Sequence, residues 1–361
     1  MKSSALSPCN IAAALFQLLF VVLTAAEGPC DILAASGNPC VAAHSTVRAL
    51  YSTYSGPLYK VTRTNNASVN ISVLRPGGFA DITVQEKFCA AGDCVIANIF
   101  DQSPQGNHLY QRISDGVVHK MVNASKHKIT VAGGVEVFGM WFDPGHGYHI
   151  DDTTGVAKGN EPESIYAVMS GTHFNGRCCF DYGNSENTRL QPVHTGDYAC
   201  GAMEAIYFGN AHWMGNTGAG PTGPWVGADL EAGMFYGGGN LTKINPGNQP
   251  LTTDFVSLHL KGRTDGFVLK GGDATRGQFK TMYDGPRPDH RSAPNNCHWH
   301  GVNGSYQPMR KQGAIILGTG GDNSNGAVGN FYEGFIATGV TSADTDDAIQ
   351  ANIVANGYQT L

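Results

Sequence analysis

The sequence has few charged residues, since Asp, Glu, Lys and Arg make up 14% of its 361 positions, where about 25% is usual. Its 23 basic residues are outnumbered by 29 acidic ones, so no basic surface for nucleic acid or anionic lipid is indicated. Repeats and low-complexity linkers are also lacking, which indicates one large domain. Hydrophobic residues, at 41%, are abundant enough for a sizeable core and exclude a disordered chain.

Helix-forming residues are scarce as well, because Gly, Ser, Thr and Asn occupy the positions where Ala, Glu, Lys and Leu would favour helices. Glycine supplies 48 residues, without the regular period of collagen. Short apolar runs alternate with glycine-rich turns, and this spacing predicts an all-β sandwich or barrel. The clearest runs cover residues 94–100, 164–169, 203–208, 255–260 and 313–317.

Two segments of this β-rich sequence have a helical pattern. Residues 41–54 place four apolar side chains on one face of a helix. Near the end, Ser342 is positioned to cap a helix that has three aspartates in its first turn and that Gly357 terminates. The sequence therefore predicts a few short helices beside the strands.

Residues 1–26 combine a basic start, a short apolar run and small residues before Ala26, which is the pattern of a secretory signal peptide. We expect cleavage after Ala26, a mature chain of residues 27–361 and an extracellular location. The run is short for a membrane span, no other stretch is long enough for one, and no lipid-anchor signal is present. Five sequons agree with secretion and are candidate glycosylation positions: Asn66, Asn70, Asn123, Asn240 and Asn303.

Eight cysteines remain after the signal peptide, and an even number in a secreted chain suggests disulfides. The short loops make Cys30–Cys40 and Cys89–Cys94 attractive pairs, although sequence alone does not fix the pairing. Cys178 and Cys179 are neighbours, with Cα atoms about 3.8 Å apart across a trans peptide against roughly 4.4–6.8 Å in most disulfides. Each of them bonding elsewhere is the commoner arrangement, and a bond between them is the alternative.

The segment from residue 225 to residue 231 carries the most informative acids. On a strand, Trp225, Gly227, Asp229 and Glu231 share one face and the apolar residues between them share the other. An indole beside two carboxylates suits a sugar, because the ring packs on the apolar sugar face while acids bind hydroxyls. The alternative, which the pattern alone slightly favours, is a solvated outer face.

A third acid, Asp322, lies in the glycine-rich loop that follows the apolar run 313–317. Glycines let the backbone approach a ligand closely. A glycosidase needs two carboxyl groups across the scissile bond, and Asp322 with Asp229 or Glu231 is a candidate pair. The alternative is a turn in which Asp322 and Asn323 satisfy local backbone groups.

Several longer motifs follow one another along almost the whole mature chain. They are Gly28-Pro-Cys30-Asp31, Cys40-Val-Ala-Ala-His-Ser-Thr46, Phe100-Asp-Gln-Ser103, Gly106-Asn-His108, Gly171-Thr-His173, Cys178-Cys-Phe-Asp-Tyr-Gly-Asn184, Met203-Glu-Ala-Ile-Tyr-Phe-Gly209, Ala228-Asp-Leu-Glu231, Gly313-Ala-Ile-Ile-Leu-Gly318, Gly320-Gly-Asp-Asn-Ser-Asn-Gly326 and Phe331-Tyr-Glu-Gly334. Together they resemble the catalytic domain of glycoside hydrolase family 54, the secreted α-L-arabinofuranosidases.

The resemblance implies a concanavalin-like β-sandwich of the jelly-roll type and a retaining mechanism without a metal or organic cofactor. It implies that Glu231 is the nucleophile, Asp322 the general acid/base and Asp229 a substrate-contacting acid. It also implies a vicinal Cys178–Cys179 disulfide under the arabinose ring.

Further sugar contacts implied by the resemblance are Met203, Trp213 and the backbone of Gly321. The pairs Cys30–Cys40 and Cys89–Cys94 match the family's other disulfides. Cys200 and Cys297 lie in segments that look inserted relative to the family, and because they are left over together we predict that they pair.

The sequence departs from the family in two places. Ala232 follows the nucleophile where the family has Asn, which puts one polar contact to the sugar in doubt. Relatives commonly carry a C-terminal arabinose-binding β-trefoil, whereas this sequence stops at Leu361, so we expect the catalytic domain over 27–361 and no trefoil.

The sequence thus predicts a monomeric, secreted hydrolase that removes terminal non-reducing α-L-arabinofuranosyl residues from arabinan and arabinoxylan of plant cell walls, with no nucleic-acid or membrane partner. The alternative from another class is a lectin-like sandwich that binds carbohydrate without turnover. A metal site built from Cys297, His298 and His300 is a weaker alternative, because that cysteine is better used in a disulfide.

Overall fold

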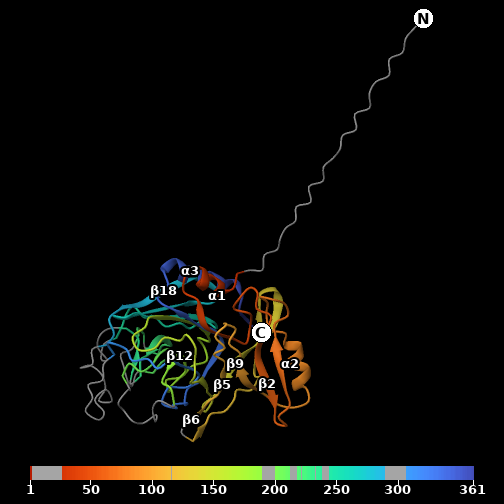
Figure 1. The fold of residues 1–361 in the computed structure, drawn as a ribbon, viewed down its shortest axis with the longest axis horizontal. Coiled ribbons are helices and arrows are strands. Elements are labelled where there is room, and N and C mark those ends of the chain that lie inside the picture. Colours follow the sequence, from red (N-terminus) through yellow and green to blue (C-terminus); the bar gives the residue numbers. More distant parts are fainter. Residues whose placement is uncertain are drawn as a thin grey trace.

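The fold is a sandwich of two antiparallel sheets in a computed structural model (Figure 1), which confirms the predicted all-β class. The structure describes residues 1, 27–114, 116–188, 200–211, 218–220, 222–231, 233–237, 244–288 and 306–361. Strands of the two sheets contact one another across the core, as β13 does with β16 and β14 with β17. Within these described residues, no helix is long and apolar enough to cross a membrane.

The first sheet has nine strands among the described residues. Its order is β18 (Arg276–Gly285), β17 (Phe267–Asp273), β16 (Val256–Gly262), β11 (Glu163–Met169), β20 (Gly329–Thr338), β9 (Val135–Phe142), β8 (His127–Val131) and β21 (Gln359–Thr360), with β1 (Cys40–Ser45) also paired to β20.

The second sheet has ten strands among the described residues and carries the predicted acids. Its order is β15 (Met234–Phe235), β14 (Trp225–Asp229), β13 (Glu204–Gly209), β12 (Asp181–Ser185), β19 (Ala314–Leu317), β10 (Tyr148–Ile150), β5 (Leu109–Gln111), β4 (Cys94–Ile99), β2 (Pro57–Arg63) and β3 (Ser68–Ser72). A separate ribbon pairs β6 (Ile113–Ser114) with β7 (Val117–Val118).

All five apolar runs singled out in the sequence form strands, namely β4, β11, β13, β16 and β19. Four of them, β11, β13, β16 and β19, are buried along their whole length. Continuous apolar runs rather than strict alternation are the pattern of strands buried on both faces.

The helix predicted over residues 41–54 is wrong. Its first part is strand β1, whose six residues are all buried and pair with β20 at the centre of the first sheet. The remainder forms turns in which Val47 and Leu50 are buried. The helix-like spacing of these apolar residues therefore comes from a loop whose side chains enter the core.

The C-terminal helix is confirmed as α3 (Ala343–Ala355). The Ser342 side chain accepts a hydrogen bond from the Thr345 NH, and Gly357 follows the helix with φ 66°. The other helices are α1 (Pro29–Ala35), α2 (Ile82–Cys89) and the short 3-10 turn η1 (Ala132–Gly134). Figure 1 shows α1 and α3 together at one edge of the sandwich, where they contact each other.

Two disulfides fasten peripheral elements to the sheets. Cys30–Cys40 joins α1 to β1, and Cys89–Cys94 joins α2 to β4. Cys297 of the predicted Cys200–Cys297 pair lies outside the described residues. Three of the predicted sequons, at Asn66, Asn70 and Asn123, are solvent-exposed, while Asn240 and Asn303 are not described.

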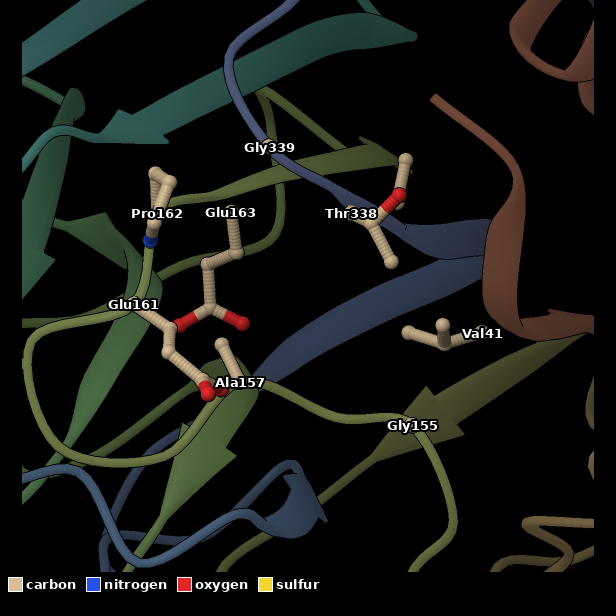
Figure 2. Close-up of a pocket in the computed structure, with 9 residues that line it drawn as sticks. Val41, Gly155, Ala157, Glu161, Pro162, Glu163, Thr338 and Gly339 are labelled. Carbon is tan, nitrogen blue, oxygen red and sulfur yellow. The ribbon is translucent and has the colours of Figure 1, made fainter. Parts of the chain in front are cut away.

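A buried ionic cluster connects the two sheets. Lys311 Nζ lies 2.8 Å from Glu163 Oε1 on β11 and 2.7 Å from Glu204 Oε2 on β13, and Arg287 lies 3.1 Å from Glu204. Figure 2 shows Glu163 beside a cavity of about 240 Å³ that Ala157 and Thr338 also line. Burial, with the nearby Glu204 charge, raises the pKa of Glu163 to about 7, although Lys311 opposes the shift.

This raised pKa makes stability depend on pH. Since the folded-state pKa exceeds the ordinary value, the Glu163 contribution is most favourable below about pH 4.5 and is lost as pH rises through about 7. We expect Glu163→Gln to match the wild type at pH 5 and to be more stable at pH 8, by up to about 3 kcal/mol. Urea unfolding at both pH values measures this. A larger deficit of the variant at pH 8 than at pH 5 contradicts it.

Candidate active site

Asp229 lies at the end of β14, on the sheet face that points away from the core. The cross-strand register runs from Ile316 through Gly183 and Ala205 to Asp229, so the small residue Ala205 lies directly beside Asp229 and Gly183 lies one strand further away. Asp229 is 4% exposed. The prediction that Asp229 and Gly227 share one face of the strand agrees with this register. The alternative of a strand with a solvated outer face is wrong, because all residues of β14 are buried.

Glu231 lies just beyond the strand rather than within it, which corrects the predicted strand over 225–231. The strand ends at Asp229, and Leu230 NH bonds to Gly233 O in the turn that leads to β15. Glu231 takes a left-handed backbone with φ 61°, and its NH donates to Asp229 Oδ1 at 2.9 Å. A left-handed non-glycine residue costs free energy, so this hydrogen bond stabilises the conformation that presents the Glu231 carboxylate.

Asp322 is exposed in the loop that follows β19. Its Oδ1 accepts a hydrogen bond from Ser324 NH at 2.8 Å, while Gly320 NH donates to Ser324 O at 2.8 Å. A Cβ at Gly320 would lie 3.1 Å from the Asp322 carboxylate, 3.1 Å from the Cys179 sulfur and 3.4 Å from the Cys178 sulfur. The missing side chain at Gly320 therefore lets this loop lie against the disulfide.

The two neighbouring cysteines are bonded to each other, so the rarer of the two arrangements considered from the sequence occurs. Their sulfurs and an Asp229 carboxylate oxygen all lie within 4.8 Å of one another. Metal ions are ligated by thiolates and not by disulfide-bonded sulfurs. The two sulfurs therefore form an apolar surface beside the Asp229 carboxylate. Below it lies a buried apolar cluster that includes Trp225, Tyr207 and Tyr236.

Trp225 belongs to this support and not to an exposed sugar platform as its strand position suggested. The indole is 2% exposed, and its NH donates to Ala219 O at 2.7 Å. Met203 is also fully buried. It packs against Ala205 and Ile316, which belong to the cross-strand register that ends at Asp229. Trp213 and Ala232 lie outside the described residues.

Gly321 directly precedes Asp322 and lies against an acid that the sequence analysis did not single out. A Cβ at Gly321 would overlap the Glu186 carboxylate, which itself accepts a hydrogen bond from the Ser185 hydroxyl at 3.1 Å. Glu186 follows β12, so its position next to the site depends on the pairing of β12 with β19. No local sequence signal reports that pairing.

Removal from water raises the pKa of Glu231 well above its usual range, and the negative charges of Glu186, Asp229 and Asp322 add to the shift. Contact with the Glu186 carboxyl group further favours the protonated form of Glu231. Glu231 and Asp322 are thus close enough for their charges to interact, although they come from different strands of the sheet.

Asp181 is a second carboxyl group that the sequence analysis did not assign. It is fully buried on β12, and burial together with the charge of Asp229 raises its pKa well above its usual range. Burial likewise raises the pKa of Asp229 to about 7, which the Glu231 NH opposes. The two carboxyl groups lie close enough for the charge of Asp229 to disfavour ionisation of Asp181, whose own oxygens have no hydrogen-bond partner among the described residues.

The site therefore has a half-buried carboxyl group, Glu231, and an exposed one, Asp322, beside an apolar disulfide surface on one face of a β-sandwich. This is the arrangement of glycoside hydrolases that place two carboxyl groups across the scissile bond. The catalytic-domain model of α-L-arabinofuranosidase B matches residues 29–359, and the chain belongs to that family, glycoside hydrolase family 54.

Individual relatives agree with this assignment. An α-L-arabinofuranosidase from Hypocrea jecorina is 44% identical over 342 residues, covering 92% of this chain and 63% of the relative. The α-L-arabinofuranosidase B of Aspergillus niger is 43% identical over 347 residues, covering 94% of this chain and 65% of the relative. The chain thus spans just under two thirds of the length of these relatives.

Solved structures show the same fold. An arabinofuranosidase complexed with arabinofuranosyl-α-1,2-xylobiose superimposes with a TM-score of 0.84 at 42% identity, covering 93% of this chain and 66% of that one. A family 54 α-L-arabinofuranosidase soaked with a cyclic sulfate inhibitor gives the same values.

With Glu231 in the expected role of nucleophile, its raised pKa gives a prediction for the acidic limb of kcat/KM, which reports ionisation of this residue in the free enzyme. Glu186→Gln removes the strongest of the neighbouring charges that raise this pKa, so Glu231 ionises at lower pH. We expect the acidic limb to move down by about 0.5–1 pH unit. The exposed Glu136→Gln serves as the control and leaves the limb in place. A limb that moves upward, or not at all, in Glu186→Gln contradicts the assignment.

Proposed function

We propose that this protein is a secreted, monomeric, retaining α-L-arabinofuranosidase that removes terminal non-reducing arabinofuranosyl residues from plant polysaccharides. The observation that carries the proposal is the placement of Glu231 and Asp322 around the Cys178–Cys179 disulfide. The xylobiose ligand of the similar solved structure supports arabinose side chains on xylan as substrate. The secretory pattern of residues 1–26 and the disulfides agree with an extracellular location.

In the first step the Glu231 carboxylate attacks the anomeric carbon, and the bond from that carbon to the glycosidic oxygen breaks. Protonated Asp322 gives its proton to the departing oxygen, so the polysaccharide leaves as an alcohol and the sugar stays on Glu231 as an ester. Asp229 accepts hydrogen bonds from the sugar hydroxyls, and the disulfide packs against the apolar side of the ring.

In the second step ionised Asp322 takes a proton from water, and the water oxygen attacks the anomeric carbon. The ester bond to Glu231 breaks, which returns the carboxylate and releases arabinose. Two displacements at the same carbon retain its configuration. Glu231, Asp322 and one water molecule together supply every proton and electron pair that the reaction needs.

Replacing either acid tests the proposal. We expect Glu231→Ala to lower kcat on an aryl α-L-arabinofuranoside by about 10³-fold or more, because no covalent intermediate forms. We expect Asp322→Asn to slow release of arabinose from arabinoxylan by at least about 10²-fold. The exposed Asp93→Asn is the control and retains wild-type rates. Near-wild-type turnover in either active-site variant contradicts the assignment.

The same assays separate the hydrolase from a lectin. A lectin-like sandwich binds arabinose-bearing polysaccharide but releases no free arabinose from it. Digestion of arabinan and of arabinoxylan, with chromatography of the released sugar, therefore decides between them and measures which polymer the enzyme prefers.

A further inference from the structure

One buried cation reaches the loop that carries Asp322. The side chain of Arg112 is fully buried, and all three of its nitrogens donate to this loop. Nη1 donates to Gly320 O at 3.0 Å, Nη2 to Gly321 O at 2.6 Å and Nε to Asn323 Oδ1 at 2.7 Å. The three acceptors lie on both sides of Asp322, about 210 positions away in sequence.

These contacts fix the backbone that leads into Asp322. The carbonyl of Gly320 belongs to the peptide plane before Gly321, and the carbonyl of Gly321 belongs to the plane before Asp322. Because peptide units are planar, holding both carbonyls fixes the orientation of two consecutive planes. The Asn323 contact then holds the residue after Asp322, which has a left-handed backbone with φ 69°.

Arg112 is itself held in place between β5 and the β6–β7 ribbon. Its NH donates to Gly147 O at 3.0 Å, and its carbonyl accepts from His119 NH at 3.0 Å. Gln111 Nε2 donates to His119 O at 2.6 Å on the adjoining turn. Both backbone groups of Arg112 are therefore bonded, so the guanidinium connects the glycine-rich loop to a fixed part of the second sheet.

The charge of Arg112 also suits this position. A guanidinium in a buried location needs anionic neighbours, and burial lowers its pKa while nearby carboxylates oppose that shift. The carboxylates concerned are Glu186, Asp151, Asp322 and Glu231. The neighbouring imidazole of His119 has its pKa lowered by burial and by Arg112.

We propose that Arg112 is a positioning residue for the general acid/base: it sets the place of Asp322 relative to the departing oxygen without touching the substrate. This inference rests on the proposed function. Lysine in its place keeps the charge but has one compact ammonium group, which does not reproduce the planar fork that holds three acceptors.

Leaving-group dependence tests the proposal, because only a poor leaving group needs the proton of Asp322 in the first step. We compare kcat/KM for 2,4-dinitrophenyl α-L-arabinofuranoside, which departs unprotonated, with kcat/KM for methyl α-L-arabinofuranoside. We expect Arg112→Lys and Arg112→Met to lose about 10- to 100-fold on the methyl glycoside and under about 3-fold on the dinitrophenyl glycoside. Asn323→Ala, which removes one contact, shifts the ratio in the same direction by less.

The ratio of the two rates is measured on one preparation, so the fraction of folded enzyme cancels and a partly unfolded variant still gives an answer. Arg75→Met, at an exposed arginine, is the control and leaves the ratio unchanged. Equal losses on both glycosides in Arg112→Lys overturn the positioning role. A wild-type protein that hydrolyses neither glycoside overturns the proposed function instead, so the two failures are distinguishable.

Discussion

The hydrogen bond from the Glu231 NH to the Asp229 carboxylate is the contact on which the site depends. It holds Glu231 in a left-handed turn directly after β14, and that turn presents the carboxylate beside the loop of Asp322. Asp229 accepts this bond while buried, where its negative charge is poorly solvated. Burial raises the pKa of Asp229 to about 7, and the hydrogen bond from the Glu231 NH stabilises its ionised form. The proposed nucleophile is therefore positioned by its contact with the buried Asp229 carboxylate in the turn after β14, rather than by a strand of its own.

Small residues make this crowding of acids feasible. Ala205 occupies the register position beside Asp229, with Gly183 on the next strand. Gly320 and Gly321 lack side chains where the Asp322 loop meets the disulfide and Glu186. Part of the glycine excess of the sequence thus has a local use at this site. Acids are concentrated on one sheet face, and bare backbone gives them room.

Much of the fold follows from sequence pattern, because the runs that became β11, β13, β16 and β19 are apolar enough to be buried on both faces. The predicted helix over 41–54 failed because β1 is equally apolar and its strand pairing is a long-range property. At the site, Asp229, Glu231 and Asp322 could be recognised in sequence motifs, whereas Glu186 and Asp181 could not. Arg112 could not be recognised either, since a lone arginine has no local signal and gains its role only through a contact with a loop about 210 positions away.

The central claim is that Glu231 bonds covalently to the sugar, and direct detection of that bond tests it best. The protein is incubated with a cyclic sulfate of arabinofuranose configuration, the class of inhibitor soaked into a similar solved structure, and is then digested and analysed by tandem mass spectrometry. The account predicts one added sugar mass on the peptide that contains Glu231, with the adduct on that side chain. An adduct on Asp322, Asp229 or Glu186 instead would contradict it.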